Sequence, residues 1–189
     1  MRFDQFLQQH GIVAVPVDQF DGFEVNVVGP QDWEVVEDRP GLRIWVWRED
    51  PYLNQFCANA VLTMHRVAAE LDPTEVFAML SDEQVHLVPG CHERQRSSAP
   101  ADGGMGIQGL LSLQFDSEFG VIDSLLRTRI ITDDDQTLIA QLTLTALHDS
   151  PVDWASIRIS VEPEPVALDA TAIPGPGSCV TFIAPGVDR

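Results

Sequence analysis

Three consecutive segments in the second half of the chain alternate between hydrophobic and polar residues. Apolar side chains recur at every second position over residues 105–115, 121–131 and 137–147. A period of two residues is typical of β-strands that bury one face. The polar residues 133–136 separate the last two segments, as expected of a hairpin turn. We therefore predict a three-stranded antiparallel meander with one apolar face and one face rich in Gln, Thr, Ser and Arg.

Shorter segments in the first half of the chain follow the same pattern. Residues 23–27, 43–47 and 57–66 alternate or form short apolar runs, so we predict three further strands. The Gly29-Pro30 pair ends the first of them. The polar face of this sheet would carry a row of amide and hydroxyl side chains. If that face is open and concave, it favours binding there, at Asn59, Thr63, Gln141 and Thr143.

Two segments begin with helix start signals. Asp72 precedes a proline and, three positions on, an acidic residue, which predicts a helix that ends before Pro89. Ser150 begins a similar pattern, so we predict a second helix after it. Residues 157–161 also alternate, and a strand remains the alternative for that segment.

These elements predict an α+β fold in which an antiparallel sheet is packed against helices. We expect a single domain over residues 1–162, since this length suffices for one hydrophobic core. Residues 163–189 are rich in Pro and Gly, and we interpret them as an irregular or weakly attached tail.

The charge of the chain narrows the class of partner. There are 29 acidic residues against 11 cationic ones, all of them Arg, and the net charge is −18. This charge argues against nucleic acid as a partner and against an anionic membrane surface. The absence of Lys excludes Schiff-base and P-loop lysine chemistry. No run of 18 apolar residues occurs, so we expect no membrane insertion.

The N-terminal residues and the cysteines bear on location. The first ten residues contain neither an apolar signal region nor a lipid-attachment cysteine. Three cysteines (Cys57, Cys91 and Cys179) without a C-x-x-C pair are typical of a reduced compartment. We therefore expect a cytoplasmic protein, with export by a route that lacks a simple signal left open.

Metal and catalytic patterns are weak, so we predict no metal, no cofactor and no catalytic residue. His86, Cys91 and His92 lack zinc spacing, and Cys57 lies too far from His65 along one strand to share an ion with it. A nucleophile built on adjacent Cys91 and His92 is improbable on geometric grounds, and no G-x-S-x-G motif is present. The acidic turn 133–135 lacks the spacing of a calcium loop, and the glycine-rich segment 103–106 lacks the spacing of a phosphate-binding loop.

Aromatic residues form a denser cluster than their overall frequency suggests. Trp33, Trp45, Trp47 and Tyr52 fall within 20 residues. Packing in the core or on a sheet face is the favoured interpretation, and we retain Trp45, Trp47 and Tyr52 as weak candidates for a binding surface. Arg127 and Arg129 lie on the polar face of their strand and could bind a carboxylate, although ion pairs within this acidic chain are the simpler role.

Five short motifs, taken in order, resemble one known family. They are Gly29-Pro30-Gln31-Asp32-Trp33, Asn59-Ala60-Val61-Leu62-Thr63-Met64, Leu71-Asp72-Pro73, Leu87-Val88-Pro89-Gly90 and Ala140-Gln141-Leu142-Thr143-Leu144-Thr145-Ala146. Over residues 15–162 this order resembles the mycobacterial LpqN/LpqT lipoprotein family of PsbP-like domains. The resemblance implies an α-β-α sandwich with an antiparallel sheet between helices. It implies a secreted or surface-attached module for interaction or binding, and it carries over no catalytic residue.

The function predicted from the sequence is a non-enzymatic binding or protein-interaction module. The partner would be an unknown protein or a small apolar ligand. The alternatives are a carrier of a small apolar ligand, with a pocket lined by Trp45 and Trp47, and a hydrolase that uses Cys91 or a histidine.

Overall fold

The computed structural model describes residues 1–29, 32–102, 105–133 and 135–164. They form two helices and ten strands: α1 is followed by five strands, and α2 by the other five. Their bounds are α1 Phe3–His10, β1 Ala14–Pro16, β2 Phe23–Val28, β3 Trp33–Arg39, β4 Leu42–Trp47, β5 Asn59–Val67, α2 Pro73–Leu87, β6 His92–Pro100, β7 Ile107–Ser117, β8 Gly120–Asp133, β9 Gln136–Leu147 and β10 Arg158–Pro163.

A large antiparallel sheet organises the fold. Its strands lie in the order β3-β4-β5-β9-β8-β7-β6. The short strand β1 pairs with the last residues of β5. The predicted meander is confirmed as β7, β8 and β9, and the predicted strands of the first half are confirmed as β2, β4 and β5. Asp133 pairs with Gln136 across the predicted hairpin turn, of which residue 134 lies outside the described residues.

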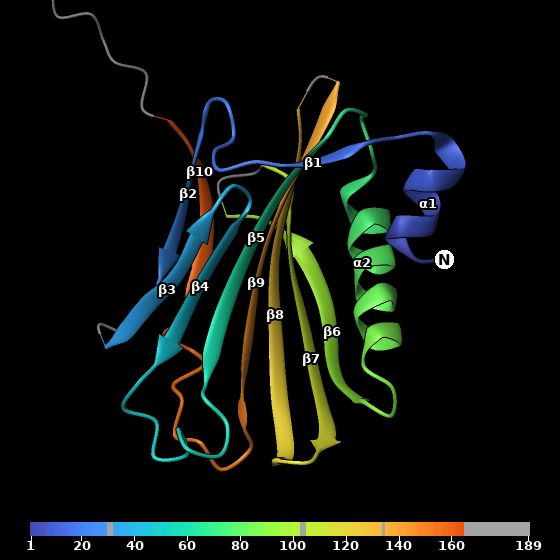
Figure 1. Ribbon diagram of the computed structural model, residues 1–189. Coiled ribbons are helices and arrows are strands. Elements are labelled where there is room, and N and C mark those ends of the chain that lie inside the picture. Colours follow the sequence, from blue (N-terminus) through green and yellow to red (C-terminus); the bar gives the residue numbers. More distant parts are fainter. Residues whose placement is uncertain (30–31, 103–104, 134, 165–189) are drawn as a thin grey trace, which may run out of the picture.

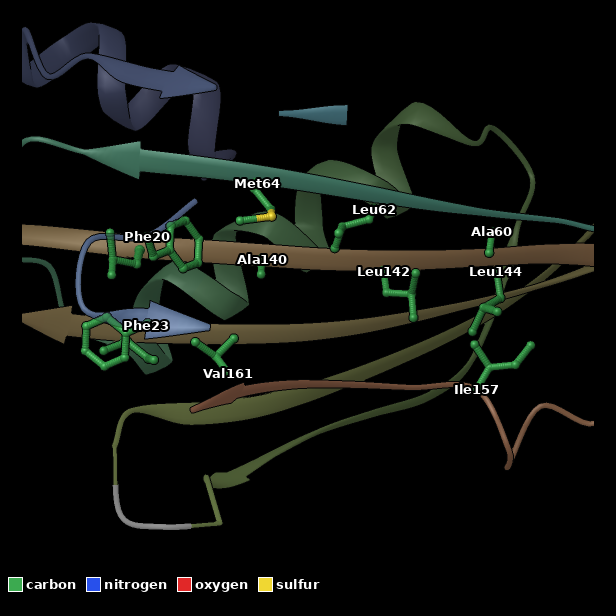
Figure 2. Close-up of a cluster of buried hydrophobic side chains, with 12 residues drawn as sticks. Phe20, Phe23, Ala60, Leu62, Met64, Ala140, Leu142, Leu144, Ile157 and Val161 are labelled. Atoms are coloured by element: carbon green, nitrogen blue, oxygen red, sulfur yellow. The ribbon is translucent and has the colours of Figure 1, made fainter. Parts of the chain in front are cut away.

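A two-stranded ribbon covers part of one face of this sheet. β2 and β10 pair with each other and pack against the even-numbered residues of β5 and β9. Figure 2 shows this cluster, with the side chains of both layers directed toward one another. Its labelled members are Phe20, Phe23, Ala60, Leu62, Met64, Ala140, Leu142, Leu144, Ile157 and Val161.

The helices lie on the opposite face of the sheet (Figure 1). α2 buries Phe77 and Leu80 against Ile130 and Ile139, which point away from the ribbon. The ring of Phe77 lies over Gly109 so closely that a Cβ there would be 2.3 Å from its Cε2 atom. α1 adds Phe3 to the same cluster. Hydrophobic clusters on both faces therefore stabilise the sheet, and the helix face carries a further one of Leu111, Leu113 and Leu126.

The ribbon and the helices cover different halves of the sheet, and this corrects one prediction. On the ribbon face, Leu62 of β5 pairs with Leu142 of β9, and Leu142 pairs with Arg127 of β8. The same face is therefore apolar on β5 and β9 and becomes polar on β8. On the helix face, Thr143 pairs with Leu126, which is buried. The apolar side of β9 thus faces the ribbon, whereas the apolar sides of β7 and β8 face α2. The sheet does not have one apolar and one polar face, as the alternation suggested.

This arrangement leaves much of the ribbon face of β7 and β8 uncovered, although β10 contacts β8 and Val161 O accepts a hydrogen bond from Arg129. We call this face of β7 and β8 the open half-face. Its side chains are Gln108, Leu110, Ser112, Gln114, Asp123, Leu125, Arg127 and Arg129. The polar row that we expected to be informative lies on the other face, beside the helices, where Gln141 is buried and Asn59, Thr63 and Thr143 are half-buried.

Local signals explain both a correct and an incorrect helix prediction. Asp72 Oδ1 accepts hydrogen bonds from Thr74 N at 2.8 Å and Glu75 N at 2.9 Å, which confirms it as the N-cap of α2. The helix predicted after Ser150 is wrong. Residues 150–157 are irregular, and β10 follows as the strand alternative had it, because pairing with β2 satisfies the backbone there.

The α+β class is confirmed, but the layer opposite the helices is the β2–β10 ribbon, so the helix-flanked sandwich implied by the resemblance is not confirmed in the described residues. Of the predicted tail, residue 163 ends β10 and residues 165–189 lie outside the described residues. None of the helices described is both long enough and apolar enough to cross a membrane.

Candidate functional site

A hollow of about 690 Å³ lies between the open half-face and the edge of the ribbon. Its floor comes from β7 and β8, one wall from β6 and the other from β10 and the loop before it. Three arginines project into it, and we call it the arginine groove. Its lining consists of Val28, Ser97, Ser98, Ala99, Asp102, Gln108, Gly109, Leu110, Arg127, Thr128, Arg129, Ala155, Arg158, Ile159 and Ser160.

Arg129 is the most deeply buried of the three arginines. Only 6% of its surface is exposed, and one terminal nitrogen donates to Val161 O at a long 3.4 Å. Its Nε atom has no hydrogen-bond partner among the described residues. Burial lowers the pKa of Arg129, while the nearby charges of Asp102 and Glu162 act in the opposite direction. The guanidinium remains charged at neutral pH, because arginine is not deprotonated in proteins.

Arg127 and Arg158 are the other two arginines of the groove and lie near each other. Arg127 is half-buried and donates to Trp154 O at 3.1 Å, and its Nε atom has no hydrogen-bond partner in the described chain. Burial lowers the pKa of Arg127, and the positive charge of Arg158 lowers it further. Arg158 is exposed and donates to Ala155 O at 3.2 Å. Three like charges thus face one groove, in which Asp102 and Glu162 act on Arg129 from beyond ion-pair distance.

A second hollow of about 410 Å³ continues along the same strands. It lies at the other end of the open half-face, and Trp154 stands between it and the arginine groove. We call it the histidine hollow. The residues that line it are Arg94, Ser112, Gln114, Asp123, Ser124, Leu125, His148 and Trp154.

A chain of hydrogen bonds crosses the histidine hollow. His148 Nδ1 lies 2.7 Å from Asp123 Oδ2, and Gln114 donates to the other oxygen of Asp123 at 2.8 Å. Arg94 donates in turn to Gln114. The hydrogen bond and the charge of Asp123 raise the pKa of His148. The imidazole is therefore held in one orientation, with its Nδ1 toward the carboxylate.

The aromatic candidates are divided between two places. Trp33 and Trp45 pack against the ribbon and line a hollow of about 140 Å³. Trp47 pairs with Trp33 across β3 and β4, and the guanidinium of Arg43 lies 5.9 Å from the ring centroid of Trp45. Tyr52 lies apart, in the turn after β4. The structure thus brings Trp45 beside Trp33, and the binding role of Trp45, Trp47 and Tyr52 stays a prediction.

The remaining sequence candidates do not come together. Cys91 is half-buried, its thiol lies 3.6 Å from Val85 O, and it packs against the buried leucines of β7 and β8. His92 begins β6 and is exposed. Among the described residues, no three of His, Cys, Asp and Glu are placed to hold a metal ion. Residues 103, 104 and 134, part of the glycine and aspartate motifs, lie outside those residues.

The sequence does not predict the two hollows as a site, although part of their lining was considered. Arg127 and Arg129 were identified on the polar face of their strand, but they were assigned to ion pairs. Their two-residue spacing places both on one face of β8, but it does not show that no carboxylate lies within ion-pair distance of them. Which residues of β6 and β10 complete the groove depends on strand pairing, and a single sequence does not specify it.

Comparison with known proteins identifies a family and a related structure. The sequence model of Lpp-LpqN, described as probable lipoprotein LpqN, matches residues 1–157, which confirms the resemblance drawn from the motifs. The chain is similar to the crystal structure of LpqN involved in cell envelope biogenesis of Mycobacterium tuberculosis, at 18% identity over 79% of this chain and 87% of that chain, with a TM-score of 0.66. A mutant of the protein Mog1 is similar at 11% identity over 72% of this chain and 79% of that chain, with a TM-score of 0.41. No curated protein matches.

The family description also corrects the expected location. We predicted a cytoplasmic protein, whereas the family is described as a probable lipoprotein, a class attached to membranes through lipid. The cytoplasmic prediction is therefore wrong. The prediction was based on the absence of an apolar signal region and a lipid-attachment cysteine from the first residues. That absence does not determine where a protein is located.

Proposed function

The chain belongs to the Lpp-LpqN family, and from this premise we propose that it is a non-enzymatic binding module of the cell envelope that holds its ligand or partner over the open half-face. The observation that carries the proposal is the pair of adjoining hollows of about 690 and 410 Å³ on one face of the sheet. Sites for small molecules usually measure about 300–1,000 Å³.

The way the site is built supports binding. Its floor consists of two long paired strands, β7 and β8, whose backbone hydrogen bonds fix the positions of the side chains. Binding groups placed on regular strands are held more accurately than groups on loops. Polar and apolar residues alternate over this floor, for example Gln108, Leu110 and Ser112. Such a surface offers both hydrogen bonds and apolar contact to a ligand.

The chemistry of the histidine hollow supports a binding role over catalysis. His148 and Asp123 form an oriented pair, the arrangement of a general base. A nucleophile activated by such a base needs to lie within hydrogen-bond reach of it. In the part of the chain that is described, the partners of His148 are Asp123 and Gln114, and no serine, threonine or cysteine side chain bonds to it.

Native mass spectrometry with a groove-filling variant tests the proposal. Gln108 is exposed on the groove floor, so Gln108→Trp places an indole in the space where a ligand would lie. Gln9 is exposed on α1, on the other side of the sheet, and Gln9→Trp is the matched control. After incubation with a mycobacterial cell-envelope extract, we expect bound mass on the wild type and the control that is lost in Gln108→Trp. Equal binding by all three proteins would contradict the proposal.

The Trp33–Trp45 hollow favours a second candidate, a carrier of a small apolar ligand. The residues that line it, Val27, Gly29, Trp33, Trp45, Ala60 and Ile157, carry no charged side chain. Its volume of about 140 Å³ is well below the usual range for drug-sized ligands and suits one ring or a short chain. A shift in Trp emission on addition of toluene, absent when Ala60→Val narrows the hollow, would support this candidate. No shift in the wild type would exclude it.

A further inference from the structure

The arginines of this acidic chain divide into two groups by their partners. Six described arginines lie within 4.0 Å of a carboxylate: Arg2, Arg39, Arg43, Arg48, Arg66 and Arg96. The other four described arginines have no such ion pair with any described residue. All four line the two hollows: Arg127, Arg129 and Arg158 in the arginine groove, and Arg94 in the histidine hollow.

This division is unexpected for a chain with 29 acidic residues. With so many carboxylates available, an arginine without an ion pair is one that the fold keeps away from carboxylates. Asp102 lines the same groove and Glu162 acts on Arg129 at longer range, but neither lies within ion-pair distance of a groove arginine. The groove therefore gathers three arginines and one lining carboxylate on a protein of net charge −18.

Burial makes the unpaired charge of Arg129 costly. A guanidinium removed from water loses solvation that only a good set of hydrogen bonds or an opposite charge restores. Arg129 has one long bond to a carbonyl, an unpaired Nε and 6% of its surface exposed. An anion seated in the groove would supply the missing partner, with the planar fork of the guanidinium matched to two oxygens.

We propose that the arginine groove binds the carboxylate or phosphate group of a small organic acid, with the buried Arg129 as the main contact and Arg127 and Arg158 as further contacts. This inference rests on the proposed function and names the chemical class of its ligand. Apolar lining from Val28, Leu110 and Ile159 gives the rest of the molecule a surface to pack on. The ligand is then an amphiphilic acid, with its charged group at the arginines.

Three probes of matched chain length test the proposal by isothermal titration calorimetry. Decanoate carries a carboxylate, decyl phosphate carries a phosphate, and 1-decanol has the same chain without charge. Each is used at a concentration at which it stays monomeric. We expect one or both acids to bind the full chain, more weakly as salt rises, and 1-decanol to bind at least about tenfold more weakly. The stronger of the two acids identifies the head group.

Neutral variants separate binding from a structural role. Arg129→Met, which keeps much of the length of the side chain, should weaken binding of the acid by at least about tenfold. It should also leave the Tm of the ligand-free protein unchanged or raise it, because a buried unpaired charge is removed. Arg48→Gln, which removes one exposed positive charge outside the groove, should bind the acid within about twofold of the wild type. Because Arg158 is exposed, the variant Arg158→Gln tests the same groove even if Arg129→Met fails to fold.

The outcomes distinguish this inference from the proposed function. Equal binding of 1-decanol and decanoate, unchanged in Arg129→Met and Arg158→Gln, would overturn the inference and leave a groove that binds without regard to charge. A lower Tm of Arg129→Met with unchanged affinity for the acids would assign that arginine a structural role and also overturn the inference. Failure of every probe to bind the wild type, together with failure of the extract experiment, would overturn both.

Discussion

The hydroxyl of Ser150 donates a hydrogen bond of 3.1 Å to the carboxylate of Asp50, 100 residues earlier in the chain. Asp50 is 3% exposed, and its two oxygens also accept from Tyr52 N at 2.9 Å and Ala58 N at 3.2 Å. This carboxylate ties the turn after β4, the start of β5 and the loop after β9 together. It thereby fixes where the irregular segment 150–157 begins, and this segment carries Trp154 to the border between the two hollows.

Removal of this carboxylate should destabilise the protein strongly. Asp50→Ala leaves the buried N–H of Ala58 and the hydroxyl of Ser150 without an acceptor, and we expect a loss of at least about 2 kcal/mol in the free energy of unfolding. Ser150→Ala removes one donor only and should cost about 1 kcal/mol. Chemical denaturation measures both, with the exposed Glu49→Ala as a control near zero. Equal stability of Asp50→Ala and Glu49→Ala would contradict this role.

A methyl group at Gly109 should disturb the packing of α2 on the sheet. Its Cβ would lie 2.3 Å from the ring of Phe77, which is buried, so the ring or the helix must move. We expect Gly109→Ala to cost about 1–3 kcal/mol by overpacking. Gly29→Ala, where nothing lies within 4 Å of the added atom, is the control. In the Phe77→Leu background Gly109→Ala should cost less, and an unchanged cost in thermal unfolding would show that the two sites are independent.

The N-cap of α2 gives a smaller effect that is specific to one helix. Asp72 accepts from the backbone N–H groups of Thr74 and Glu75, and its loss leaves these exposed donors to water. We expect Asp72→Ala to lower the free energy of unfolding by about 1 kcal/mol and Asp72→Asn by clearly less. Asp149→Ala, an exposed aspartate outside the helices, should be near neutral. Urea denaturation of the three variants decides the question, and identical midpoints for Asp72→Ala and Asp149→Ala would contradict the cap.

The His148–Asp123 pair should make stability depend on pH. Asp123 raises the pKa of His148 in the folded protein above its value in the unfolded chain. The stabilisation is therefore fully present below the unfolded pKa of about 6.5 and is lost as the pH rises through the folded pKa. We expect His148→Gln to reduce the decline of Tm with pH in this window, and His92→Gln, an exposed histidine on β6, to leave it as in the wild type. An NMR titration that places the pKa of His148 at or below about 6.5 would contradict the interpretation.

How much of this fold follows from the sequence depends on the kind of information each element needs. The strands β7, β8 and β9 and the start of α2 were predictable, since alternation and capping are local properties of the residues involved. The direction of each apolar face was not, because Thr143 pairs with Leu126 and Leu142 with Arg127 only in the folded register. A shift of one residue in that register would exchange the two faces.

The candidate site was predictable to the same limited extent. Its floor includes Arg127 and Arg129, which two-residue spacing places on one face of one strand. Its walls come from β6 and β10, more than 50 residues apart in the chain. Ser150 was mistaken for a helix cap because its local sequence resembles that of Asp72, whereas its hydrogen bond goes to Asp50. Tertiary contacts of this kind have no local signature.

A side-chain NMR titration tests the central claim most directly. One ¹H–¹⁵N spectrum reports the Nε–H groups of the arginines and the Nε1–H groups of the tryptophans, so the two candidate places are compared in one sample. On addition of decanoate, we predict that the Nε signals of Arg127 and Arg129 shift, that those of the ion-paired Arg43 and Arg48 stay unchanged, and that 1-decanol has no effect on any of them. Unchanged Arg127 and Arg129 signals, or a response confined to Trp33 and Trp45, would contradict the account.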